Sequence, residues 1–121
     1  TPLVGEAARR GDTVALRIVR QAGEHMAEQT EGLIRRERVP ECERHVTCCG
    51  GAWKTHPAMY ASFVSSLDAR GLRARAELPR FEPVMARAAA TMLDRGMDSE
   101  SAARLMAEKF PDYSINWQGG A

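Results

Sequence analysis

Apolar residues along this chain follow two different spacings. Residues 13–37 carry apolar side chains at helical spacing, and Asp12, directly before them, is a good N-cap residue. Residues 44–49 are instead β-branched or small, and the glycines that follow end the run. The first pattern predicts a long helix that ends before Pro40, and the second predicts a strand.

The same patterns predict alternating helices and strands over the rest of the chain. Thr55 is a candidate cap for a helix that Gly71 ends, and Asp98 is a candidate cap for the last helix. In chain order, the predicted elements are helices 3–10 and 13–37, strand 44–49, helix 56–70, strand 72–78, and helices 83–95 and 99–110. Strands that alternate with helices imply parallel strands joined by right-handed crossovers, so we expect the α/β fold class. Two strands are too few for a stable sheet, so we also expect further strands from a partner or from an upstream part of the polypeptide.

Length and composition fit one modest globular domain. The chain has 121 residues, 44% apolar and 27% charged. Its 17 basic and 16 acidic residues give a net charge of +1, which is no electrostatic signature for nucleic acid or for an anionic membrane. No apolar run reaches the roughly 20 residues of a spanning helix, and no signal peptide opens the sequence. Three cysteines do not make a disulfide framework, so we expect a cytoplasmic protein.

The stretch "CCGGAWKT" (48–55) contains the candidate chemistry. A zinc site would need four ligands converging on one point, but side chains on a strand alternate between faces and rise about 3.3 Å per residue. The sequence therefore predicts no metal site in the candidate set Cys42, His45, Cys48 and Cys49. A nucleophilic cysteine would need a base and an electropositive surrounding, and small buried residues on a strand are the simpler interpretation.

A P-loop is also excluded, because that loop requires a glycine directly before its lysine and Trp53 stands there. What remains is a strand whose glycine pair, Gly50 and Gly51, leads into a helix. Glycines let a ligand lie against the backbone, and ligands collect beyond the carboxyl ends of strands in open α/β sheets. Trp53 could then cover a flat ring and Lys54 could meet a phosphate. Spacing alone equally allows the glycines only to form the turn, with Trp53 packed beneath it.

Four segments together resemble one family. They are "GDTVALRIVRQAGEHMAEQTEGLI" (11–34), "VTCCGGAWKTHPAMYASF" (46–63), "PRFEPVMARAAATML" (79–93) and "FPDYSINW" (110–117). In this order they resemble the second domain of N-acetylglucosamine kinases and of the related BadF/BadG/BcrA/BcrD-type ATPases. The Gly-Gly-Ala-Trp-Lys motif with its strand is the most specific of the four.

The resemblance implies an actin-like (ribonuclease H-like) ATPase fold, with residues 1–121 as the C-terminal part of its second domain. It implies a homodimeric kinase that uses ATP and Mg²⁺ to phosphorylate an amino sugar such as N-acetylglucosamine. It implies no catalytic residue within these 121 residues, since the phosphate loop and catalytic aspartate would lie upstream, so the chain alone would be inactive. The nucleotide-binding residues that it implies are Gly50, Gly51, Ala52, Trp53 and Lys54.

The sequence departs from the family in one place and leaves two alternative functions open. The family's final helix usually carries a Gly-Ala pair where this chain has Ala86-Arg87, which puts the fit of a nucleotide in doubt. One alternative is an ATPase that activates a partner enzyme through a cysteine-bound iron–sulfur cluster, and the placement of Cys48 and Cys49 on a predicted core strand argues against it. The other is a non-catalytic binding or regulatory domain, which the Ala86-Arg87 pair favours.

Overall fold

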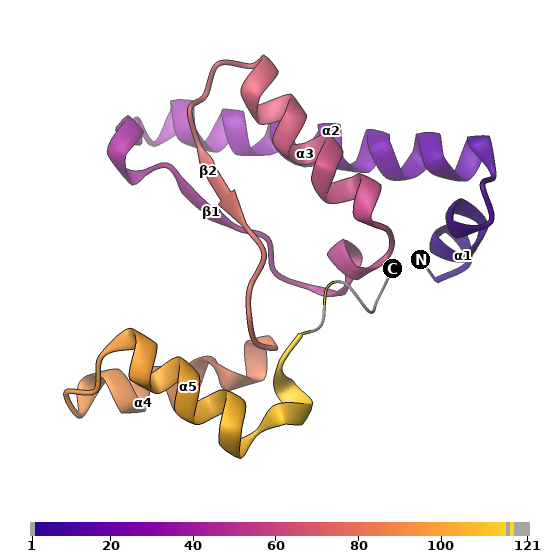
Figure 1. The fold of residues 1–121 in the computed structure, drawn as a ribbon. Helices are drawn as coiled ribbons and strands as arrows, with labels where there is room; N and C mark the ends of the chain where they lie inside the picture. The colour runs from indigo at the N-terminus through magenta and orange to yellow at the C-terminus, as the bar shows by residue number, and fades with distance from the viewer. Residues whose placement is uncertain (1, 116, 118–121) are drawn as a thin grey trace. The chain divides into compact units, whose positions relative to one another are not determined.

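The computed structural model describes residues 2–115 and 117, and it divides into two compact units after Leu78. The first unit contains helices α1 (Pro2–Arg9), α2 (Thr13–Arg36) and α3 (Pro57–Ala69), strands β1 (His45–Thr47) and β2 (Arg75–Glu77), and 3₁₀ helices Glu41–Glu43 and Gly51–Lys54. The second contains helices α4 (Ala86–Asp94) and α5 (Ser99–Lys109), and 3₁₀ helices Pro83–Met85 and Pro111–Tyr113 (Figure 1). The long helix and the last helix lie where the sequence predicts them.

Helix α2 begins and ends as its capping residues dictate. The side chain of Asp12 accepts a hydrogen bond from the Ala15 amide at 2.9 Å, which confirms the predicted N-cap. At the other end Arg38 has a φ of 52°, and the Val39 amide donates to the Ile34 carbonyl. This is the left-handed termination that usually employs glycine, here adopted by an arginine.

The core of the first unit lies between α2 and α3, which cross closely (Figure 1). The closest approach is at Gly23 in the middle of α2, where an added Cβ would lie 2.3 Å from the Met59 carbonyl oxygen of α3. Phe63 and Leu67 of α3 are each only 1% exposed. The Ser62 hydroxyl adds a hydrogen bond across the pair, donating to the Arg20 carbonyl at 2.7 Å. A side-chain-free position on α2 therefore sets the spacing of the two helices.

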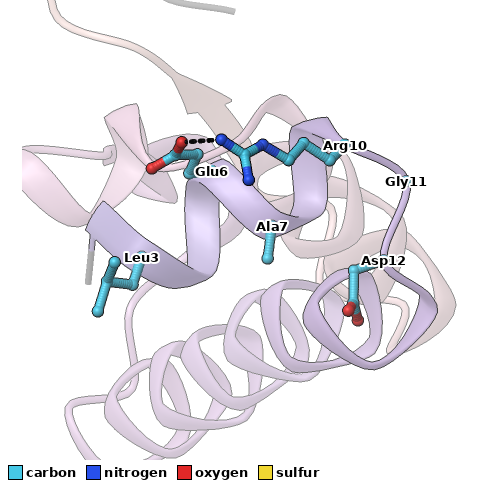
Figure 2. A pocket seen from close by; sticks show the side chains of 6 residues that line it. All are labelled: Leu3, Glu6, Ala7, Arg10, Gly11 and Asp12. Atoms are coloured by element: carbon cyan, nitrogen blue, oxygen red, sulfur yellow. Dashed lines mark hydrogen bonds and ion pairs between the residues drawn. The ribbon is translucent and has the colours of Figure 1, made fainter.

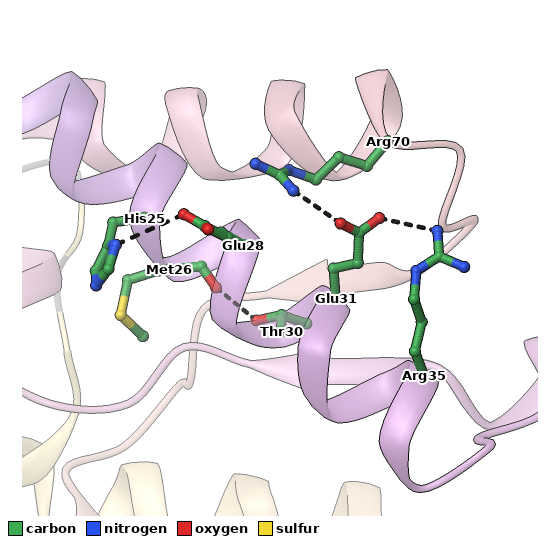
Figure 3. A network of polar contacts seen from close by, with 7 residues as sticks. All are labelled: His25, Met26, Glu28, Thr30, Glu31, Arg35 and Arg70. Atoms are coloured by element: carbon green, nitrogen blue, oxygen red, sulfur yellow. Dashed lines mark hydrogen bonds and ion pairs between the residues drawn. The ribbon is translucent and has the colours of Figure 1, made fainter.

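An ion-pair network joins the far ends of the same helices (Figure 3). The Glu31 carboxylate of α2 accepts from Arg35, one turn later, at 3.0 Å and from Arg70 at the end of α3 at 2.8 Å. The Arg35 hydrogen bond, with that from Arg70, holds the pKa of the Glu31 carboxyl below its usual value despite partial desolvation. The network fixes the C-terminal end of α3 against α2.

Strands β1 and β2 run parallel, with Val46 opposite Ala76, and α3 forms the connection between them. The predicted parallel pair is confirmed, but each strand has three residues and is shorter than the sequence predicts. The Arg44 guanidinium ties together the loops that lead into the strands, donating to the carbonyls of Val39 and Leu72.

The fold class predicted from the sequence is wrong. The structure is mostly helical (68%), and its two short strands do not form the strand–helix layers of an actin-like (ribonuclease H-like) ATPase half-domain. The physical reason is burial. Only the central residue of each strand, Val46 or Ala76, is even half-buried, so pairing the strands removes little apolar surface from water. The larger apolar side chains are instead buried between helices.

The second unit is a pair of helices, and the segments before and after the pair contact each other. Gly96, with a φ of 89°, ends α4, and Asp98 caps α5 by accepting from the Ser101 amide at 2.8 Å, as the sequence predicts. Phe81 bridges Ser114 in antiparallel fashion, and the Trp117 indole donates to the Pro79 carbonyl at 2.8 Å. The aromatic residue near the end of the chain thus closes this unit on its own first residue.

Candidate functional site

The glycine pair lies on an exposed corner beyond the carboxyl end of β1. The Cys48 amide still donates to the Glu77 carbonyl at 3.0 Å, after which the backbone leaves β2. Gly50 has a φ of 109°, a conformation that side chains rarely allow. A Cβ added to Gly50 or to Gly51 would meet nothing within 4 Å. The backbone of both residues is therefore open to solvent, in the position where the sequence predicts that a ligand would approach.

Trp53 does not lie on that open surface. Its side chain is 6% exposed, and its ring packs edge-on against Phe63 at 5.2 Å and Tyr60 at 6.4 Å between ring centroids. A ring enclosed in this way has little area left to cover a ligand, so Trp53 anchors the turn to the core of the unit. Of the five candidate residues, the structure exposes Gly50, Gly51, Ala52 and Lys54 and buries the fifth.

Helix α3 is capped by His56 and not, as the sequence predicts, by Thr55. The His56 ring accepts a hydrogen bond from the Ala58 amide through Nδ1 at 3.0 Å. Thr55 has helical torsions because it ends the 3₁₀ helix Gly51–Lys54, whereas an N-cap residue needs the extended backbone that His56 adopts. Pro57 is the sequence feature that indicates this cap. Proline favours the first position inside a helix, which makes residue 56 the N-cap.

The cysteines do not form a reactive or metal-binding cluster in the part of the chain that the structure describes. Cys48 is 3% exposed, whereas Cys42 and Cys49 are exposed, and all three are free thiols. No group of three His, Cys, Asp or Glu side chains among residues 2–115 and 117 could hold a metal ion. His45, a member of the candidate zinc set, pairs with Glu77 across the strands at 3.1 Å.

Burial controls the ionisation of the groups beneath the corner. Burial, with a smaller effect of the neighbouring Cys49, raises the pKa of the Cys48 thiol from 9.0 to about 11. Burial also raises the pKa of Tyr60, whose hydroxyl donates to the Ala76 carbonyl at 3.1 Å. A thiol that is buried and held protonated is a poor nucleophile, so the surroundings of Cys48 favour a packing role.

Because the pKa of the Cys48 thiol is raised in the folded chain, we expect the free energy of unfolding to fall at alkaline pH. Between pH 9 and 11 the folded chain keeps the thiol proton that the unfolded chain releases, so the free energy of unfolding should fall as pH rises through this window and be unaffected by this group below pH 9. Urea titrations at pH 8 and pH 10.5 should show a smaller drop in the free energy of unfolding for Cys48→Ala than for the unsubstituted chain.

Below pH 9, Ellman's reagent should label Cys42 and Cys49 quickly and Cys48 only after unfolding. Equal labelling of all three thiols in the folded chain would contradict the assigned burial.

The Ala86-Arg87 pair lies in the second unit. Both residues begin α4, and both side chains are exposed. The Arg87 carbonyl accepts a hydrogen bond from the Thr91 hydroxyl at 3.0 Å, one turn further along α4. The structure thus gives this departure from the family a surface position within its unit.

An open pocket of about 460 Å³ lies on a different part of the first unit (Figure 2). It is formed by one face of α1 and the turn into α2, with an ion pair between Glu6 and Arg10 at its side and the capping residue Asp12 at its end. One oxygen of Asp12 is engaged as the α2 cap, and Glu6 and Arg10 pair with each other on the surface of α1. The glycine corner remains the candidate site.

Comparison of the chain with protein-family models, with curated proteins and with solved structures found no significant match. The resemblance to N-acetylglucosamine kinases therefore stays a hypothesis carried by the sequence motif. Within the described residues, no helix has both the length and the apolar character needed to cross a membrane.

Proposed function

We propose that the Gly50–Lys54 turn forms part of a nucleotide-binding site and contacts the adenosine side of ATP. The observation that carries the proposal is the open backbone of Gly50 and Gly51 beyond the carboxyl end of a parallel strand. Parallel β–α–β units bind nucleotides at this end because backbone amides there can meet polar ligand atoms without interference from side chains.

Each residue of the turn has a distinct part in this proposal. Gly50 and Gly51 provide close approach to the nucleotide, and Lys54 offers a positive charge to a phosphate or a hydrogen bond to the ribose. Ala52 has only a methyl side chain, so it adds little bulk to the exposed face of the turn. Trp53 acts from beneath, because its buried ring fixes the turn to α3.

The activity that this site serves is, in our proposal, ATP-dependent phosphate transfer to an amino sugar such as N-acetylglucosamine. The motif Gly-Gly-Ala-Trp-Lys supports this assignment through its resemblance to the kinase family; the observed fold does not contribute to it. The described residues offer no carboxylate cluster for Mg²⁺, so we assign them no step that involves the metal. We place the general base and the sugar contacts on another part of a homodimeric cytoplasmic enzyme, which would bring them to the nucleotide by domain closure.

The variant Gly51→Val tests the proposal. A valine here would occupy the space that the nucleotide needs, and we expect MgATP affinity measured by calorimetry to fall by more than about tenfold. The chain should still fold, because Gly51 lacks a positive φ and its added Cβ meets nothing. Gly50 is less suited to the test, since its own φ of 109° would strain any side chain.

Gly32→Ala is the matched control, because Gly32 is an exposed glycine of α2 with open space around it. It should bind MgATP as the unsubstituted chain does. In the native-length protein, addition of N-acetylglucosamine should increase the rate of ADP release from MgATP. In the Gly51→Val variant of that protein, the sugar should cause no such increase. Hydrolysis that ignores the sugar would favour an ATPase that activates a partner enzyme, and absence of any MgATP binding would favour a non-catalytic binding domain.

A further inference from the structure

The turn that forms the candidate site is held from outside by the first helix of the chain. Thr55 directly follows the 3₁₀ helix Gly51–Lys54, and its amide donates to the Ala52 carbonyl at 3.1 Å. The Thr55 carbonyl in turn accepts a hydrogen bond from the Arg9 guanidinium of α1 at 2.8 Å. A charged donor from a distant part of the sequence thus fixes the residue at which the turn ends.

The backbone of α1 approaches the same carbonyl. A Cβ added to Gly5 would lie 2.6 Å from the Thr55 carbonyl oxygen and 2.9 Å from Thr55 Cγ2. Real side chains do not tolerate contacts this short, so Gly5 is a position where α1 needs a glycine to reach Thr55. Gly5 and Arg9 lie one turn apart on α1 and therefore face the turn together.

The opposite side of the turn is fixed by the core, because Trp53 is enclosed by aromatic rings of α3. The exposed glycines precede this doubly held segment and have no side chains of their own to define their position. Their placement therefore depends on the residues that flank them, which on the N-terminal side include the buried Cys48, whose amide donates to the Glu77 carbonyl. On the C-terminal side they are Trp53, which packs into the core, and Thr55, which α1 contacts from outside.

We propose that α1 is the positioning element of the glycine corner, and that Arg9 acts as a positioning residue through the Thr55 carbonyl. The proposal rests on the nucleotide-binding function given above and adds α1 as a determinant of affinity. Loss of the Arg9 hydrogen bond should let Thr55 and the turn before it sample other conformations. Ligand affinity then falls because only a fraction of the molecules present the corner in its binding form.

Arg9→Met tests the proposal, because it keeps a long side chain and removes every donor. We expect hydrogen–deuterium exchange at the amides of Thr55 and Ala58 to become about two- to tenfold faster, the factor that corresponds to one net hydrogen bond. Affinity for MgATP should fall by a similar factor. Amides in the middle of α2 should keep their protection.

Arg10→Met is the matched control. Arg10 is the next residue of α1, lines the open pocket of Figure 2 and pairs with Glu6 of its own helix. Neither exchange at Thr55 nor MgATP affinity should respond to it. Arg9→Lys, which retains a donor, should restore part of the protection, and Gly5→Ala, which pushes on the same carbonyl, should act like Arg9→Met.

The exchange data decide the proposal without any nucleotide. Unchanged exchange at Thr55 and Ala58 in both Arg9→Met and Gly5→Ala would overturn it. Faster exchange with unchanged MgATP affinity would overturn it as well, because α1 would then hold the turn without positioning a site. If the unsubstituted chain binds no MgATP, the proposed function fails, and the exchange response still shows whether α1 fixes the turn.

Discussion

Trp53→Ala should destabilise the first unit by about 3–5 kcal/mol, the usual range for truncating a large buried aromatic side chain. The reason is the enclosed position of the ring, 6% exposed and in edge contact with Phe63 and Tyr60. Urea unfolding followed by circular dichroism would measure the loss as a lower midpoint. No ligand is needed, since the lost contacts are within the chain.

The size of this effect separates two interpretations of the tryptophan. A ring that covered a nucleotide in an open site would be exposed in the free protein, and its removal would change stability by less than about 0.5 kcal/mol. Trp53→Phe serves as the control, because it retains an aromatic ring against Phe63 and should cost less than Trp53→Ala. A near-neutral Trp53→Ala would contradict the packing described for the turn.

Gly23→Ala should destabilise the same unit by about 3 kcal/mol, near the upper end of the range for overpacking a core. The added methyl would lie 2.3 Å from the Met59 carbonyl oxygen and 2.9 Å from the Phe63 amide nitrogen. Both are backbone atoms of α3, so relief requires the two helices to move apart. Thermal or urea unfolding would measure the change.

Gly32→Ala in the same helix makes the comparison internal. Its methyl would meet nothing within 4 Å, and alanine has the higher helix propensity, so this variant should gain about 0.5–1 kcal/mol. Opposite signs for one chemical change in one helix are the expected result. Equal effects at the two positions would show that α2 and α3 do not approach at Gly23.

Local signals in the sequence located the helices well. Asp12 and Asp98 accept from the amides expected of N-caps, and Gly71 and Gly96 have the positive φ of helix ends. These signals depend on a few neighbouring residues, which is why the sequence alone contains them. The predicted cap of α3, Thr55, is wrong by one residue, because Pro57 occupies the first helical position and makes His56 the N-cap.

Long-range packing could not be predicted in the same way. The run around Val46 suggested a full strand, yet the number of paired residues depends on where β2 ends and on how much side-chain area the pairing buries. A glycine inside a helix is a weak sign of close approach, and nothing local to Gly23 states which residue it meets. The order of the elements predicts an α/β fold class, and this prediction is wrong because burial between α2 and α3 dominates the structure.

The candidate site shows the same division. The exposed position of Gly50 and Gly51 after a strand followed from sequence order, and the structure places them there. The spacing of the sequence equally allows Trp53 to face solvent or to pack inward. Its contacts with Phe63 and Tyr60 of α3 show that it packs in the core. The contact between Arg9 and Thr55 joins residues far apart in the sequence, so no local pattern could reveal it.

Nitrogen–proton correlation spectra recorded during a MgATP titration test the central claim most directly. If the corner binds the nucleotide, the amides of Gly50, Gly51, Ala52 and Lys54 should shift with saturation, while the amide of Gly32 stays in place. Absence of shifts at the glycine pair, or shifts confined to the pocket of Glu6 and Asp12, would contradict nucleotide binding at the end of β1.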